Sequence, residues 1–180
     1  MNGPQENIIL VGFMGTGKSS LGRLLAKKTG KRFLDTDQLI VQKEGKEISV
    51  IFQEKGEEYF RGVESSVLQG LHLSTGRVIA TGGGIVTIPA NTAILKELGF
   101  VVWLQAAEQE IFKRVSRNSK RPLLKTENPR KTISDLLAKR SPLYGSACHF
   151  SIDTTLLTHK QAAEAIISEA NLHFSVQNRA

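Results

Sequence analysis

The chain has 180 residues, of which 40% are hydrophobic and 23% charged, and its formal net charge is +7. This length suits one domain with one sizeable core, which we expect to span residues 1–180. The sequence has no apolar run of the about 18 residues that a membrane helix needs, and the run at 8–14 is too short for a signal-peptide core. A single cysteine excludes an internal disulfide. We therefore expect a cytoplasmic protein with no membrane partner.

The positive charge favours anionic partners. Basic residues are spread along the chain and are densest at 113–139, a stretch without any aromatic residue. Nucleic-acid-binding segments usually belong to a recognisable module or combine basic residues with aromatic ones that stack on bases. We therefore expect a small phosphorylated or carboxylated ligand and no nucleic-acid partner.

Short apolar segments alternate with helical segments along the chain. In chain order, the expected strands are residues 8–11, 31–34, 78–80, 100–104 and 149–152, and the expected helices are residues 18–28, 47–71, 107–115, 131–143 and 160–170. This alternation predicts a parallel sheet covered on both faces, which is a three-layer α/β domain. Residues 171–180 are expected to form a frayed polar tail. Ligands bind at the carboxyl ends of such strands, so the loops after Val11, Leu34 and Ala80 should share one edge.

The first expected strand is followed by a phosphate-binding pattern. Residues 12–19 read GFMGTGKS and match G-x-x-x-x-G-K-[ST] at every fixed position. Glycines let the backbone approach a phosphate, successive amides point into one concavity, and the following helix adds the positive end of its dipole. In this pattern Lys18 reaches the β- and γ-phosphates, and Ser19 supplies a hydroxyl to Mg²⁺. The predicted phosphate-binding residues are Gly15, Thr16, Gly17, Lys18, Ser19 and Ser20.

Two charged pairs follow this loop. Asp35 and Asp37 come directly after the second expected strand, where one carboxylate can hold the water shell of a metal while the other accepts a hydroxyl proton. The alternative is that Asp37 only caps the next helix. Arg61 and Glu64 lie three residues apart in an expected helix and share one face, so they can pair. The alternative for this pair is an exposed ion pair worth under ~1 kcal/mol.

Two later segments also have an unusual composition. The glycines at 82–84 directly follow the third expected strand, and their cost in backbone entropy is reasonable where amides must approach a ligand. A flexible turn is the alternative. Residues 116–130 are polar and basic and include Arg121, which we interpret as a mobile lid that carries an arginine. A solvated loop is the alternative for this segment. Arg140 follows near the end of an expected helix.

Taken in this order, the motifs resemble those of the shikimate kinase family, over about residues 7–170. The matching segments are the phosphate loop at 12–19, Asp-x-Asp at 35–37, Phe-Arg-x-x-Glu at 60–64, Gly-Gly-Gly at 82–84, Arg-Pro-Leu-Leu at 121–124 and Arg-x-x-x-Tyr at 140–144. The resemblance implies a P-loop kinase fold with a five-stranded parallel sheet, a mobile lid and substrate-binding helices. It also implies transfer of the γ-phosphoryl group of ATP to the 3-hydroxyl of shikimate by a monomer that uses Mg²⁺.

The resemblance further implies roles for individual residues. Asp37 matches the residue that holds shikimate hydroxyls and acts as the base, and Arg61 and Arg140 match arginines that bind the carboxylate as planar forks. The implied substrate-binding residues are Asp37, Phe52, Phe60, Arg61, Glu64, Gly82, Gly83, Gly84 and Arg140. The implied catalytic residues are Lys18, Asp37 and Arg121, the implied metal ligands are Ser19 and Asp35, and the implied nucleotide contacts outside the loop are Arg114 and Arg121.

The sequence departs from the family pattern after the last expected strand. Many members carry a basic residue there, near the adenine, whereas residues 153–157 read DTTLL. The source of adenine contacts at this loop is therefore left open. Two rival functions are also left open: a related kinase for another small polyol acid such as gluconate, and a nucleotide-binding regulatory protein without catalysis.

Overall fold

The computed structural model describes residues 6–116 and 127–177. Five parallel strands form one sheet in the order β2-β3-β1-β4-β5. The strands are β1 (Ile8–Val11), β2 (Arg32–Asp35), β3 (Arg77–Ala80), β4 (Phe100–Gln105) and β5 (Phe150–Asp153). The central strand β1 is buried along its whole length, as its unbroken apolar sequence predicts. The predicted three-layer α/β fold is confirmed.

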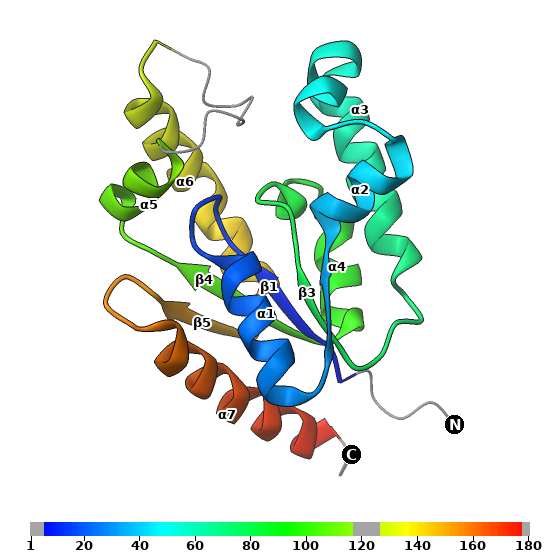
Figure 1. The fold of residues 1–180 in the computed structure, drawn as a ribbon, viewed down its shortest axis with the longest axis vertical. Coiled ribbons are helices and arrows are strands. Elements are labelled where there is room, and N and C mark those ends of the chain that lie inside the picture. Colours follow the sequence, from blue (N-terminus) through cyan, green and yellow to red (C-terminus); the bar gives the residue numbers. More distant parts are fainter. Residues whose placement is uncertain (1–5, 117–126, 178–180) are drawn as a thin grey trace.

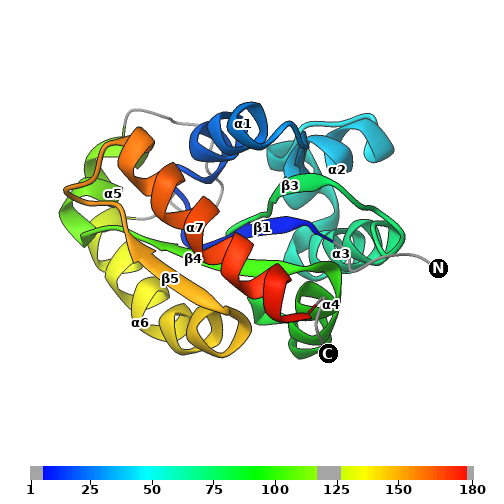
Figure 2. The same ribbon diagram turned by 90° about the horizontal axis from the view of Figure 1, so that it is seen from below.

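Helices cover both faces of the sheet (Figures 1 and 2). Within the described residues they are α1 (Lys18–Thr29), α2 (Thr36–Glu44), α3 (Ile48–Gly70), α4 (Pro89–Leu98), α5 (Glu108–Val115), α6 (Pro129–Ala147) and α7 (His159–Gln177), together with a short 3₁₀ turn, η1 (Ile85–Thr87). Helices α1 and α7 lie together on one face, and α4 and α6 lie on the other (Figure 2). None of the described helices is long and apolar enough to cross a membrane.

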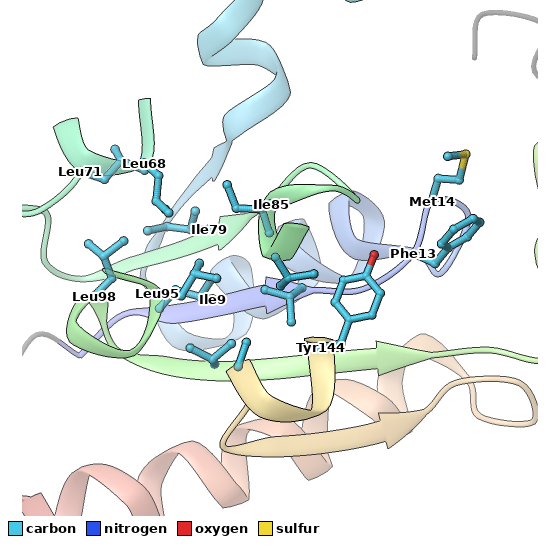
Figure 3. Close-up of a cluster of buried hydrophobic side chains, with 14 of the residues drawn as sticks. Ile9, Phe13, Met14, Leu68, Leu71, Ile79, Ile85, Leu95, Leu98 and Tyr144 are labelled. Carbon is cyan, nitrogen blue, oxygen red and sulfur yellow. The ribbon is translucent and has the colours of Figure 1, made fainter. Parts of the chain in front are cut away.

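The alternation of side chains along β1 divides the core into two layers. Ile8 and Leu10 pack under α1 and α7, whereas Ile9 and Val11 pack toward α4 and α6. All four side chains are at most 1% exposed. Figure 3 shows the second of these layers, with Ile9 among Leu95, Leu98 and Ile79. A smaller third cluster, centred on Ile40, joins α2 to α3. This third cluster holds the two helices together above the carboxyl ends of the strands, which is where the site lies.

Three features differ from the expectation for the chain. Helices α2 and α4 lie in segments for which no helix was expected. Helix α3 changes direction at Gly56, whose backbone is in a left-handed region (φ 80°). The expected frayed tail is wrong for residues 171–177, because α7 continues through them to Gln177. Phe174 is buried there and packs its ring edge-on against Phe100, with 6.3 Å between the ring centroids.

Candidate active site

The phosphate loop connects β1 to α1 and closes on itself. Lys18 Nζ donates to the carbonyl oxygens of Gly12 (2.7 Å) and Phe13 (3.0 Å), and Thr16 Oγ1 also donates to Phe13 O (2.8 Å). A Cβ on Gly12 would collide with the carbonyl oxygen of Leu104, so the loop requires glycine at this point. The first turn of α1 is therefore held in the position that the pattern predicts for phosphate binding.

A hydroxyl–carboxylate pair lies beside the start of α1. Ser19 Oγ donates to Asp35 Oδ2 at 2.7 Å, and the other oxygen of Asp35 accepts from the backbone N–H of Asp37 at 3.1 Å. Asp35 is thus the N-cap of α2, and Asp37 lies in the first turn of that helix. The alternative that Asp37 only caps the helix is therefore wrong.

Ser19 and Asp35 fit a magnesium ion by their chemistry. A hydroxyl and a carboxylate are hard oxygen donors, and Mg²⁺ typically keeps several waters and takes only one or two protein ligands beside the substrate phosphates. Among residues 6–116 and 127–177, no group of three or more His, Cys, Asp or Glu residues could hold a metal ion. Ser19 and Asp35 are thus of the donor type that Mg²⁺ takes from a protein.

A pocket of about 680 Å³ lies beside the phosphate loop, between α2, α3, the 82–84 turn and α6. It is lined by every residue that was predicted to bind substrate: Asp37, Phe52, Phe60, Arg61, Glu64, Gly82, Gly83, Gly84 and Arg140. Sequence reasoning missed seven further lining residues: Met14, Gln38, Val41, Gln42, Glu47, Ile48 and Ser49. Gln38, Val41 and Gln42 belong to α2, so recognising this helix would have been the signal for them.

A buried ion pair forms one wall of the pocket. Arg61 Nη1 donates to Glu64 Oε2 at 2.7 Å, and Arg61 Nη2 donates to Glu57 Oε1 at 2.9 Å. Glu64 is completely buried and Arg61 is 8% exposed, so the alternative of an exposed surface pair is wrong. Burial raises the pKa of Glu64, whereas the guanidinium of Arg61 acts against this rise. The pair fixes one cation of the pocket at a defined place.

The 82–84 turn lies close to these charged groups. A Cβ on Gly82 would meet Asp37 Oδ1 at 2.8 Å and would collide with Glu64 Oε1, and a Cβ on Gly84 would collide with the guanidinium of Arg61. Any larger residue would therefore displace the charged side chains from the pocket. The alternative of a merely flexible turn does not explain this close packing.

Arg140 approaches the same turn from α6. Its Nη1 atom donates to the carbonyl oxygen of Gly83 at 3.3 Å, and the side chain is 4% exposed. Tyr144, one helical turn later, also donates its hydroxyl to Gly83 O. Arg61 on α3 and Arg140 on α6 thus enter the pocket from two different helices. The carboxylate of Asp37 enters it from a third helix, α2.

This geometry can be compared with known proteins. A sequence model of the family described as shikimate kinase matches residues 14–171. The chain belongs to the shikimate kinase family. A shikimate kinase from Thermodesulfovibrio yellowstonii is 47% identical over 164 residues, which cover 91% of this chain and 94% of the relative. A second one, from Thioalkalivibrio sulfidiphilus, is 39% identical over 97% of this chain and 90% of the relative. The resemblance inferred from the motifs is confirmed.

Solved structures agree with this family. The shikimate kinase from Acinetobacter baumannii in complex with shikimate has a TM-score of 0.89 and is 40% identical, with 93% of each chain covered. A gluconokinase from Sinorhizobium meliloti 1021 has a TM-score of 0.57 and is 13% identical, with 97% of this chain and 99% of that chain covered. The likeness to the gluconokinase shows the fold alone. The predicted P-loop kinase fold is thus confirmed by a member of the same family.

Two nucleotide contacts, Arg114 and Arg121, were predicted outside the phosphate loop. Arg114 is exposed, and its Nη1 atom donates to the carbonyl oxygen of Gly15 at 3.2 Å, so it lies at the phosphate loop. His159, at the start of α7, lies 3.0 Å from the hydroxyl of Ser20 through its Nε2 atom. Arg121 and most of the expected lid lie outside the described residues.

Proposed function

We propose that the protein transfers the γ-phosphoryl group of ATP to the 3-hydroxyl group of shikimate, giving ADP and shikimate 3-phosphate. The observation that carries this proposal is one pocket that joins Arg61, Arg140 and Asp37 beside a phosphate loop. A small acid with hydroxyl groups needs cations for its carboxylate and an acceptor for a hydroxyl proton. Membership of the shikimate kinase family favours shikimate as this acid.

The two arginines would hold the substrate carboxylate. A guanidinium offers parallel N–H donors that match a carboxylate with two hydrogen bonds, which the ammonium of lysine cannot do. Glu64 and Glu57 hold Arg61 in place, so less freedom is lost when the acid binds. The aromatic rings of Phe52 and Phe60, whose centroids are 4.6 Å apart, give the pocket an apolar wall for the ring of the substrate.

Phosphoryl transfer would then need positioning and charge neutralisation more than covalent chemistry by the protein. The substrate oxygen forms a bond to the γ-phosphorus, the bond to the β,γ-bridging oxygen breaks, and ADP leaves with that electron pair. The hydroxyl proton passes to the carboxylate of Asp37. Ser19 and Asp35 would hold Mg²⁺, which neutralises charge on the phosphates when it is bound. Lys18, and in this proposal Arg121, add positive charge at the γ-phosphoryl group.

Gluconate and loss of catalysis are the rival functions. The likeness to a gluconokinase extends only to the fold, so it does not favour gluconate. A non-catalytic nucleotide-binding protein is expected to lack part of the machinery, whereas Lys18, Ser19 and Asp37 are all present at the pocket and the phosphate loop. We therefore place both rivals behind shikimate kinase activity.

An ADP-release assay with ATP and Mg²⁺ tests the proposal. We expect ADP release that depends on shikimate, with gluconate as the matched control acid that gives only the background rate. ADP release with gluconate and not with shikimate would assign the pocket to another acid. ATP binding without ADP release from either acid would instead favour the regulatory protein.

The proposal also covers the assembly and the location of the protein. ATP and shikimate are its small-molecule partners, and it acts as a monomer in the cytoplasm. Sedimentation at the concentration of the assay should give the mass of one chain, and a dimer would contradict this part of the proposal.

A further inference from the structure

The carbonyl oxygen of Gly83 accepts hydrogen bonds from two side chains of α6. One donor is the hydroxyl of Tyr144, and the other is Nη1 of Arg140 at 3.3 Å. Tyr144 is 1% exposed, and Figure 3 shows its ring extending from α6 with the hydroxyl at the far end. The two donors have different neighbours, because Arg140 lines the acid pocket and the ring of Tyr144 lies in the hydrophobic core.

Gly83 lies where the acid pocket meets the phosphate loop. A Cβ on this residue would come within 3.2 Å of the backbone nitrogen of Met14, so the turn lies directly on the loop. The carbonyl oxygens of its two neighbours are held locally: Gly82 O accepts from the N–H of Ile85 at 3.3 Å, and Gly84 O accepts from Thr87 Oγ1 at 2.7 Å. The middle carbonyl is instead held from α6, more than fifty residues away along the chain.

Tyr144 is chemically suited to hold this carbonyl. Burial raises the pKa of its hydroxyl, so it remains a neutral donor at the pH of the cytoplasm. Its ring is stacked on that of Trp103 in β4, with 5.8 Å between the centroids, so the hydroxyl is carried on a rigid support. A phenylalanine would fill the same space and would lack only the donor.

We propose that Tyr144 is a positioning residue for the substrate carboxylate. Its hydroxyl satisfies the buried carbonyl of Gly83, which leaves the guanidinium of Arg140 available to the acid. Without this hydroxyl, Arg140 is the remaining donor to a buried acceptor, and leaving such an acceptor unpaired is costly. Arg140, which already donates to Gly83 O at the long distance of 3.3 Å, is then drawn closer to this carbonyl at the expense of the substrate. This inference rests on the proposed function, since it assigns the carboxylate of shikimate to Arg140.

The variant Tyr144→Phe tests the inference. We expect the KM for shikimate to rise about tenfold, which corresponds to about 1.4 kcal/mol, while kcat and the KM for ATP change less than twofold. The matched control is Ser141→Ala, which also removes one hydroxyl from α6, where it donates to Leu137 O at 2.7 Å. The control should leave all three constants unchanged. A purely structural role for Tyr144 would lower the melting temperature and leave the KM for shikimate unaltered, which would overturn the inference.

A double-mutant cycle with Arg140→Ala provides the second measurement. If Tyr144 acts through Arg140, Tyr144→Phe has little further effect on the KM for shikimate once Arg140 is absent. Additive effects of the two substitutions would overturn the inference. The wild-type protein separates this result from the proposed function: absence of shikimate phosphorylation by the wild type refutes the function itself, whereas normal turnover with an unchanged variant refutes only the role of Tyr144.

Discussion

The two halves of the site are built in opposite ways. In the phosphate loop, the side chains of Lys18 and Thr16 donate to the carbonyl oxygens of Gly12 and Phe13, which lie no more than six positions away. In the acid pocket, the N–H of Gly82 donates to Thr36 across 46 positions, and Tyr144 reaches Gly83 across 61. The side chains of Lys18 and Thr16 are thus placed by a short stretch of sequence, whereas these contacts of Gly82 and Gly83 form only after the chain has folded.

This difference has a functional consequence. A change in the phosphate loop should affect handling of the nucleotide and therefore every substrate equally. A change in the pocket should affect the acid and leave the nucleotide alone, provided that Gly83 stays against the loop. Substitutions in the two halves can therefore be separated by their effects on the two KM values and on kcat.

The largest effect is expected from Lys18→Ala in the loop. This change removes the cation at the phosphates, and we expect kcat to fall by about 10³-fold, since losing one preorganised donor costs about 10²–10³ in rate. Steady-state ADP release measures it, with the exposed Lys27 of the same helix changed to alanine as the control. A loss confined to the KM for shikimate would contradict the separation of the two halves.

Asp37→Asn should give the next largest effect, because it removes the proposed acceptor of the hydroxyl proton. We expect kcat to fall by about 10²-fold, within the range for general-base catalysis, with a small change in the KM for ATP. The exposed Asp135 on α6, changed to asparagine, is the control. Near-normal turnover of Asp37→Asn would exclude this residue as an essential base.

Arg61→Lys tests the pocket without removing its charge. Lysine cannot form the planar fork, so we expect the KM for shikimate to rise about tenfold with little change in the KM for ATP. The exposed Arg32, changed to lysine, controls for the exchange itself. An unchanged KM for shikimate would remove Arg61 from the substrate site.

The smallest predicted effect lies outside both halves. Burial lowers the pKa of His173 and of His149, whose rings are 4.8 Å apart, and the positive charges of His173 and of Lys96 lower the pKa of His149 further. Their contribution to stability is therefore fully present above the ordinary histidine pKa and is lost as the pH falls through the lowered values. His173→Leu should reduce the fall of the melting temperature in acid by about 2–4 °C.

Thermal unfolding across this pH range measures the effect, with His72→Gln as the control at an exposed position. An unaltered pH dependence in His173→Leu would mean that the acid sensitivity of the protein arises elsewhere. A change in kcat for this variant would show that the core beneath α7 is coupled to the site. This core would then affect catalysis in addition to the phosphate loop and the acid pocket.

Which features can be predicted from the sequence depends on how far apart along the chain the contacting residues lie. The strands, the phosphate loop and α1 follow from local patterns, because an apolar run and a glycine-rich motif carry their own signals. The pairing of Arg61 with Glu64 also follows from helical spacing. Whether that pair is buried does not, since α2 and the 82–84 turn cover it from elsewhere in the chain.

Features that depend on contacts between distant residues were not predicted from local sequence patterns. Helix α2 is short and its N-cap, Asp35, was interpreted mainly as a metal ligand, so the helix between Asp35 and Gly45 was missed. The tail was interpreted as polar because the apolar residues near Phe174 are few, although that single ring packs on Phe100 in β4. The strand order and the contact of Tyr144 with Gly83 have no local signal, and only the folded sheet brings those residues together.

The stacking of Trp103 on Tyr144 has a practical consequence. Trp103 is the only tryptophan of the chain, so the tryptophan fluorescence of the protein comes from one indole, which is stacked on the side chain that holds Gly83. Occupation of the acid pocket should therefore alter the emission without any added label. The protein carries its own optical probe of the acid, and a titration followed by emission would measure a dissociation constant in the absence of turnover.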